Sequence, residues 1–141
     1  MFSKILLPVD LTELKMSRKA IVDATALAKA FNSELRLLNV QSLLPVSFLD
    51  YVEKDFEAEI RQGLEEEISA LARGVDYPAE RISTKIHYGP VHHKILEEAE
   101  AWGADLIVLC SHRPDRDRYL IGSTASAIVH NAKRSVWVVR R

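Results

Sequence analysis

The chain has 141 residues, of which 48% are hydrophobic and 28% charged, and its formal net charge is −1. This length suits one domain with a full core, and we expect residues 1–141 to form that domain. The near-zero net charge argues against a broad nucleic-acid-binding surface. No apolar run is long enough to span a membrane, no signal-peptide pattern is present, and Cys110 is the single cysteine, so the sequence predicts a cytoplasmic protein.

Five short apolar segments alternate with segments of helical periodicity. The predicted strands cover 5–9, 34–40, 82–88, 106–109 and 135–139. The predicted helices cover 13–31, 50–73 and 91–102, and a fourth has an apolar stripe that starts at Ala125. Such alternation predicts an α/β fold with an open parallel five-stranded sheet and helices on both faces. Right-handed crossovers and one reversal of winding give the strand order 3-2-1-4-5.

The predicted helix 50–73 and the predicted strand 82–88 each have one face that the sequence pattern leaves less covered. The helix 50–73 carries one apolar stripe, and its three consecutive glutamates, 65–67, indicate a solvated face. The stripe consists of Phe56, Ile60, Leu64, Ile68 and Leu71. The strand 82–88 alternates between apolar and polar residues, which predicts an edge strand with one less covered face.

A strand, a polar loop and a glycine-led helix start follow one another in residues 106–124. The loop carries Arg113, Arg116 and Arg118, and it closes at Gly122, Ser123 and Thr124. Backbone N–H groups at a helix N-terminus bind anions, and the helix dipole favours negative charge there. The segment therefore predicts a phosphate site, with an ordinary helix cap on a βα loop as the alternative.

Polar residues also follow the first strand at the expected switch point of the sheet. Ligands of open α/β sheets bind beyond the carboxyl ends of the strands, where the winding reverses. The strand order brings Pro8, Val9 and Asp10 beside Cys110, Ser111 and His112. Asp10 is a candidate for contact with a ribose hydroxyl or a metal, with a turn or cap aspartate as the alternative.

Two stretches of the chain carry a resemblance to a known family. The opening Lys-Ile-Leu-Leu-Pro-Val-Asp resembles the first strand of the universal stress protein family. The end of the chain, from the Ser-His-Arg-Pro-Asp that starts at Ser111 through Tyr-Leu-Ile-Gly-Ser to Ser-Val-Trp-Val-Val-Arg, resembles a small bacterial subgroup of that family. The resemblance covers essentially the full length. The nucleotide-binding branch of the family has glycines where this chain has Cys110 and Arg113, and eight residues, not nine, separate Arg113 from Gly122.

The resemblance implies an ATP-binding protein with a regulatory role in the stress response. By position, it implies that Val9 and the backbone of Val40 contact adenine, and that Asp10 lies near the ribose or a Mg²⁺ ion. Cys110 and Arg113 would line the loop under the ribose and phosphates. Ser111 and His112 lie between them and are further candidates, with a side chain that faces the core as the alternative for either one. The phosphates themselves would be held by Gly122, Ser123 and Thr124.

Two other functions remain open from the sequence. One is slow ATP hydrolysis, although the chain has no Gly-x-x-x-x-Gly-Lys-Ser/Thr motif. The other is dimerisation and partner recruitment without a nucleotide. The predicted edge strand 135–139 contains no charge, which makes it a template for strand pairing. Together with the family resemblance, this predicts a homodimer through the last strand, or a tetramer built from it, and Trp137 packed under the fourth helix is the alternative.

Overall fold

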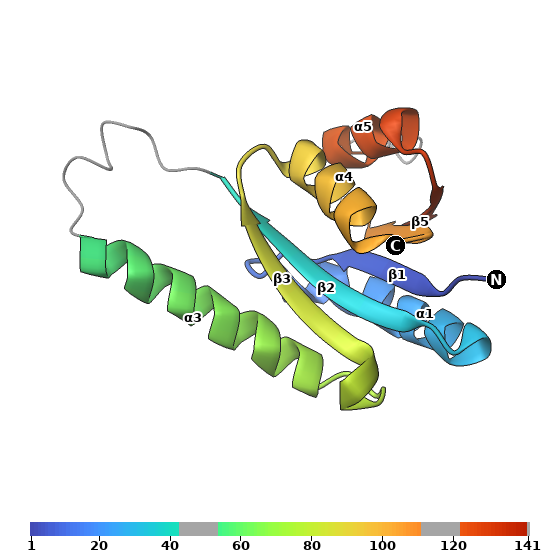
Figure 1. Ribbon diagram of the computed structural model, residues 1–141, viewed down its shortest axis with the longest axis horizontal. Helices are drawn as coiled ribbons and strands as arrows, with labels where there is room; N and C mark the ends of the chain where they lie inside the picture. The colour runs from blue at the N-terminus through green and yellow to red at the C-terminus, as the bar shows by residue number, and fades with distance from the viewer. Residues whose placement is uncertain (43–53, 111–121, 141) are drawn as a thin grey trace.

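The computed structural model describes residues 1–42, 54–110 and 122–140, and it contains a five-stranded sheet with helices on both faces (Figure 1). The strand order is β3-β2-β1-β4-β5, and every neighbouring pair is parallel, which confirms the predicted fold class and order. The strands are β1 (Lys4–Pro8), β2 (Glu34–Gln41), β3 (Ile82–Tyr88), β4 (Leu106–Cys110) and β5 (Ser135–Val139).

The helices form two layers that cover opposite faces of the sheet. They are α1 (Leu14–Phe31), α3 (Lys54–Arg73), α4 (Val91–Trp102) and α5 (Ser123–Asn131), with a short 3-10 turn at Ala79–Arg81. Buried residues of α1 and α3 pack with one set of strand side chains, and those of α4 and α5 pack with the other. Because α1 leads away from β1 on one face and α4 leads into β4 on the other, the winding reverses between β1 and β4.

The central strands are apolar on both sides because both of their faces are covered. In β1, Ile5 and Leu7 pack toward α1, whereas Leu6 packs toward α4 and α5. All three side chains are fully buried. In β4 the same alternation places Val108 in the layer of α1 and α3 and Ile107 in the layer of α4 and α5. This two-sided burial explains why the sequence shows continuous apolar runs at these strands.

Only the C-terminal part of α3 is buried against the sheet. Ile68 is 1% exposed, whereas Phe56 and Ile60 are 48% and 41% exposed. The single apolar stripe predicted for this helix therefore does not form one buried face. Figure 1 shows the reason, because the N-terminal end of α3 extends beyond the strands that its other end covers. The glutamates 65–67 are exposed, as the sequence predicts.

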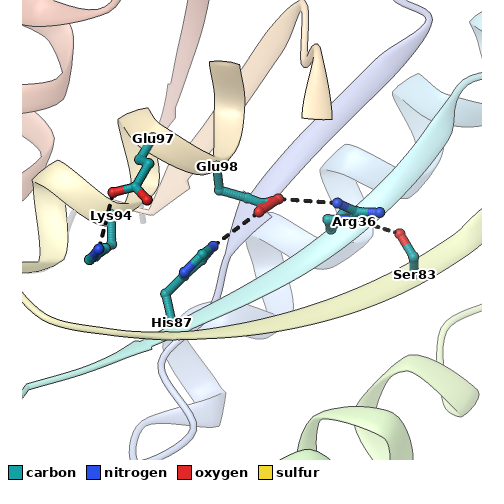
Figure 2. Close-up of polar contacts among 6 residues, drawn as sticks. All are labelled: Arg36, Ser83, His87, Lys94, Glu97 and Glu98. Carbon is teal, nitrogen blue, oxygen red and sulfur yellow. Dashed lines mark hydrogen bonds and ion pairs between the residues drawn. The ribbon is translucent and has the colours of Figure 1, made fainter. Parts of the chain in front are cut away.

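A buried carboxylate joins α4 to the two strands beneath it (Figure 2). Glu98 accepts a hydrogen bond at 3.1 Å from Arg36 Nη1, and its other oxygen lies 3.0 Å from His87 Nε2. Arg36 also donates from Nε to Ser83 Oγ at 2.9 Å, and its guanidinium lies 4.5 Å from the ring centroid of Trp102. The Glu98 side chain is only 5% exposed, so Arg36 and His87 must offset the cost of removing its carboxylate from water.

The strand β5 lies at one edge of the sheet and carries an exposed aromatic side chain. Val139 is 3% exposed in the layer of α1, whereas Trp137 is 36% exposed. Val136 packs with the α4 and α5 layer. Since side chains alternate along a strand, Trp137 shares the face of Val139, away from α5. The alternative that Trp137 packs under the fourth helix is therefore wrong.

Candidate functional site

A pocket of about 430 Å³ opens at the carboxyl ends of β1, β2 and β4, beside the starts of α4 and α5. Its apolar walls include Val9, Val40, Ile95 and Leu109. This volume lies in the range of small-molecule sites, which are concave and mostly apolar with a few polar groups. Because the ends of β1 and β4 line it, the pocket lies at the switch point of the sheet, where the sequence predicts a ligand.

Two helices begin at this pocket with N-cap residues whose own side chains do not cap them. Gly122 is the N-cap of α5 and Pro90 is the N-cap of α4, and among the described residues neither N-cap forms a side-chain cap hydrogen bond and neither first turn contains an acidic residue. The first N–H groups of a helix have no partner within it, and they carry the positive end of the dipole. Thr124 and Val91, from these two first turns, line the pocket. The arrangement favours an anionic group in the pocket.

A glycine sets the direction in which α4 approaches the pocket. Gly89 connects β3 to α4 with a φ of 139°, a conformation that side-chain-bearing residues rarely adopt. A Cβ at this position would also meet Lys94 Cε at 2.9 Å. The Gly89 N–H donates to the Gln41 carbonyl at 2.9 Å, which ties the start of α4 to the end of β2.

Asp10 lines the pocket and is also part of a local turn. Its Oδ1 accepts hydrogen bonds from the Thr12 backbone N–H at 2.9 Å and from the Thr12 hydroxyl at 2.6 Å. The Asp10 N–H donates to Ser17 Oγ at 3.2 Å, and Ser17 is only 4% exposed. The turn role that the sequence left as an alternative is thus present, and it holds the carboxylate at the pocket wall.

Cys110 ends β4 at the pocket. Its Sγ lies 3.1 Å from the Met16 carbonyl oxygen, in the geometry of a weak S–H donor. Cys110 is half-buried and forms no disulfide. The thiol therefore lies between β4 and α1.

Two amide side chains, which the sequence pattern did not single out, line the pocket at the end of β2. Asn39 is 3% exposed and donates from Nδ2 to the Val9 carbonyl at 2.9 Å. Gln41 donates from Nε2 to Asn39 Oδ1 at 2.6 Å. The sequence does contain a signal, because polar residues at these two positions interrupt the apolar pattern of a strand that ends at the ligand edge.

The structure brings together many of the residues that the sequence singled out. The pocket is lined by Pro8, Val9, Asp10, Val40, Cys110 and Thr124. Gly122 and Ser123 belong to the same helix start as Thr124 but do not line the pocket, and Ser123 is exposed. Three further predicted residues, Ser111, His112 and Arg113, lie outside the described residues.

Neither a membrane span nor a protein-only metal cluster occurs in the parts of the chain that the structure describes. No helix within 1–42, 54–110 and 122–140 is long and apolar enough to cross a membrane. The same ranges contain no group of three or more His, Cys, Asp or Glu side chains arranged to hold a metal ion. Among the described residues that line the pocket, Asp10 is the only one with a carboxylate side chain.

The model of the universal stress protein family matches residues 1–140. Universal stress protein G of Shigella flexneri is 32% identical over 144 residues, which cover 99% of this chain and 100% of that protein. A universal stress protein of Methanocaldococcus jannaschii is 31% identical over 146 residues, covering 100% of this chain and 84% of that protein.

Solved structures have the same fold. The universal stress protein UspA from Lactobacillus plantarum is similar with a TM-score of 0.77 and 25% identity, over 98% of this chain and 97% of that one. A universal stress protein solved in complex with cAMP is similar with a TM-score of 0.66 and 21% identity, over 99% of this chain and 97% of that one.

Proposed function

We propose that this chain, which belongs to the universal stress protein family, binds ATP in the pocket at the switch point and acts as a regulatory protein in the stress response. The observation that carries the proposal is the pocket itself, which has apolar walls and lies at two helix starts whose N-cap residues, Gly122 and Pro90, form no side-chain cap hydrogen bond in the described part of the chain. A nucleotide has a matching division between a flat, largely apolar base and an anionic tail. The fold accommodates an adenine nucleotide in the relative that was solved with cAMP.

The two ends of the nucleotide fit different parts of the pocket. The base lies against Val9 and Val40, at the ends of β1 and β2. The phosphates lie at the first turn of α5, where Gly122 and Ser123 adjoin the pocket-lining Thr124. Backbone N–H groups there supply donors for the phosphate oxygens. The loop residues Ser111, His112 and Arg113 complete the phosphate site in this proposal.

Asp10 is the carboxylate that would hold Mg²⁺ with the nucleotide. Mg²⁺ is commonly bound by one or two carboxylates, by substrate phosphates and by water, so one aspartate is sufficient. The Thr12 contacts hold Asp10 Oδ1 in a turn at the pocket wall. When bound, the ion would neutralise part of the phosphate charge.

We expect Asp10→Asn to reduce nucleotide-induced stabilisation without disturbing the turn, because an amide oxygen still accepts from Thr12 whereas the charge is lost. ATP with Mg²⁺ at about 100 times its Kd should stabilise the wild type by about 2.7 kcal/mol. The variant should show about half of that stabilisation or less, and its ligand-free Tm should stay within about 3 °C of the wild type. Differential scanning fluorimetry with and without Mg-ATP measures both.

Asp76→Asn is the matched control for Asp10→Asn. Asp76 is a surface carboxylate paired with Lys29, and its side chain is 97% exposed and away from the pocket. This variant should keep the wild-type response to Mg-ATP. An unchanged response in Asp10→Asn as well would show that Asp10 serves only the turn.

We expect little or no ATP turnover at this site. The chain has no Gly-x-x-x-x-Gly-Lys-Ser/Thr motif, and the pocket residues outside the proposed loop 111–113 include no histidine, lysine or arginine among those described. A general base must lie within hydrogen-bond reach of the proton that it takes, and Asp10 is already committed to the Thr12 turn. The role that we propose is therefore regulatory binding of the nucleotide, and slow hydrolysis remains the alternative. We place this role in the cytoplasm, as the sequence predicts.

The proposal includes a homodimer through β5, and a tetramer built from that dimer is the alternative assembly. This strand is at the sheet edge, and an apolar edge can pair with the same strand of a second copy in a closed twofold contact. The exposed side chain of Trp137 supports the proposal, because an interface would cover it.

Trp137→Lys should convert the dimer to a monomer at micromolar concentration, because a charge at the edge opposes strand pairing. Light scattering coupled to size exclusion gives the mass of each species. Val22→Lys replaces another exposed apolar residue, which is 66% exposed on α1, and it should leave the dimer intact. A monomeric wild type would end the dimer proposal, and a dimeric Trp137→Lys would move the interface elsewhere.

A further inference from the structure

The amide pair of Asn39 and Gln41 is fixed in one orientation by its hydrogen bonds. The Val9 carbonyl can only accept, so the Asn39 atom that faces it at 2.9 Å must be the donor Nδ2. The carbonyl oxygen Oδ1 of Asn39 is then directed to Gln41 and accepts from its Nε2 at 2.6 Å. The first hydrogen bond therefore determines which atom of the Asn39 amide faces Gln41, because the donor nitrogen and the acceptor oxygen of an amide lie on opposite arms.

This chain of bonds leaves an acceptor, Gln41 Oε1, at the end of the pair. Gln41 lines the pocket and follows Val40 directly, at the base end of the proposed nucleotide site. Its backbone is held as well, because its carbonyl accepts from the Gly89 N–H at 2.9 Å. Rotating the Gln41 amide would bring its oxygen against Asn39 Oδ1 and break the pair. The pocket therefore presents an oriented acceptor at this wall.

We propose that Gln41, oriented by Asn39 and the Val9 carbonyl, is a specificity-determining residue that selects a 6-aminopurine over a 6-oxopurine. This inference rests on the proposed nucleotide binding. The exocyclic amino group of adenine is a donor and matches the Gln41 oxygen, whereas the 6-oxo group of hypoxanthine is a second acceptor. A site built to hydrogen-bond a ligand rejects an analogue that lacks the matching group, because buried polar groups are left unpaired.

ATP and ITP test the inference, because the two nucleotides differ only in the 6-substituent of the base, amino or oxo, and in N1, which carries a proton in hypoxanthine. We expect the wild type to bind ATP at least about tenfold more tightly than ITP. In Gln41→Met, which has a side chain of similar length without the amide, the ratio of the two Kd values should fall to about one or two. Titration calorimetry of the full chain with each nucleotide measures the ratio. A purely structural role for Gln41 would weaken both nucleotides equally and leave the ratio unchanged.

Ser42→Ala is the matched control, because Ser42 also lines the pocket beside Gln41 and should not alter the ratio. A wild type that binds ATP and ITP equally would overturn this inference alone, as would a Gln41→Met variant that keeps the wild-type ratio. A wild type that binds neither nucleotide would overturn the proposed function and this inference together.

Discussion

Glu98→Ala should lower the free energy of unfolding by about 3 kcal/mol and the Tm by roughly 10 °C. The Glu98 carboxylate is the shared partner of Arg36 and His87, at 3.1 and 3.0 Å. Removing it leaves a guanidinium, whose side chain is only 21% exposed, without its carboxylate. Breaking a buried pair from one side costs more than the pair contributes, because the remaining charge keeps its desolvation penalty.

Glu97→Ala is the matched control on the same helix. Glu97 pairs with Lys94 at 3.1 Å, but its side chain is 58% exposed, so we expect a loss within about 0.5 kcal/mol. Chemical denaturation followed by circular dichroism gives both values. If Glu98→Ala cost no more than Glu97→Ala, the Arg36–Glu98–His87 cluster would not hold α4 against β2 and β3.

Gly122→Val should weaken ATP binding by at least about tenfold, or about 1.4 kcal/mol. The backbone of Gly122 has φ −56° and ψ 156°, which residues with side chains also adopt, so valine introduces no backbone strain. Its effect is to place an isopropyl group at the N-cap of α5, where the proposed phosphates approach the N–H groups. Titration calorimetry with ATP compares the variant with the wild type.

Gly63→Val is the control for this substitution. Gly63 lies in α3, and, apart from its two chain neighbours and the adjacent backbone of the helix, no described atom lies within 4 Å of the Cβ that a side chain would add. Valine there should leave the ATP affinity unchanged, although it alters helix propensity. Equal affinity in Gly122→Val and the wild type would show that the phosphates do not lie at the start of α5.

The fold was predictable from the sequence because its strongest signals are local. Continuous apolar runs mark β1 and β4, which are covered on both faces, and helical periodicity marks the segments between them. The packing of α3 was less predictable. Its apolar stripe includes Phe56 and Ile60 as well as Ile68, and periodicity alone does not reveal that the sheet ends before the helix does.

The site was predictable where it depends on strand ends and on the family resemblance. Val9, Asp10 and Thr124 line one pocket, as expected from the switch point. The polar partners were missed because their roles depend on tertiary neighbours. Asn39 is placed by a carbonyl 30 positions away in the sequence, and Glu98 by side chains of two strands. A single sequence gives no spacing rule for such contacts.

The measurement that tests nucleotide binding most directly is titration calorimetry of nucleotide-free wild-type protein with Mg-ATP. Binding at the switch-point pocket predicts a saturable heat with one ATP per chain, because each chain carries its own β1, β2, β4 and α5 around the pocket. The same titration of Gly122→Val should show a right-shifted curve with the same stoichiometry. The absence of any binding heat from wild-type protein at millimolar ATP would contradict the proposed function.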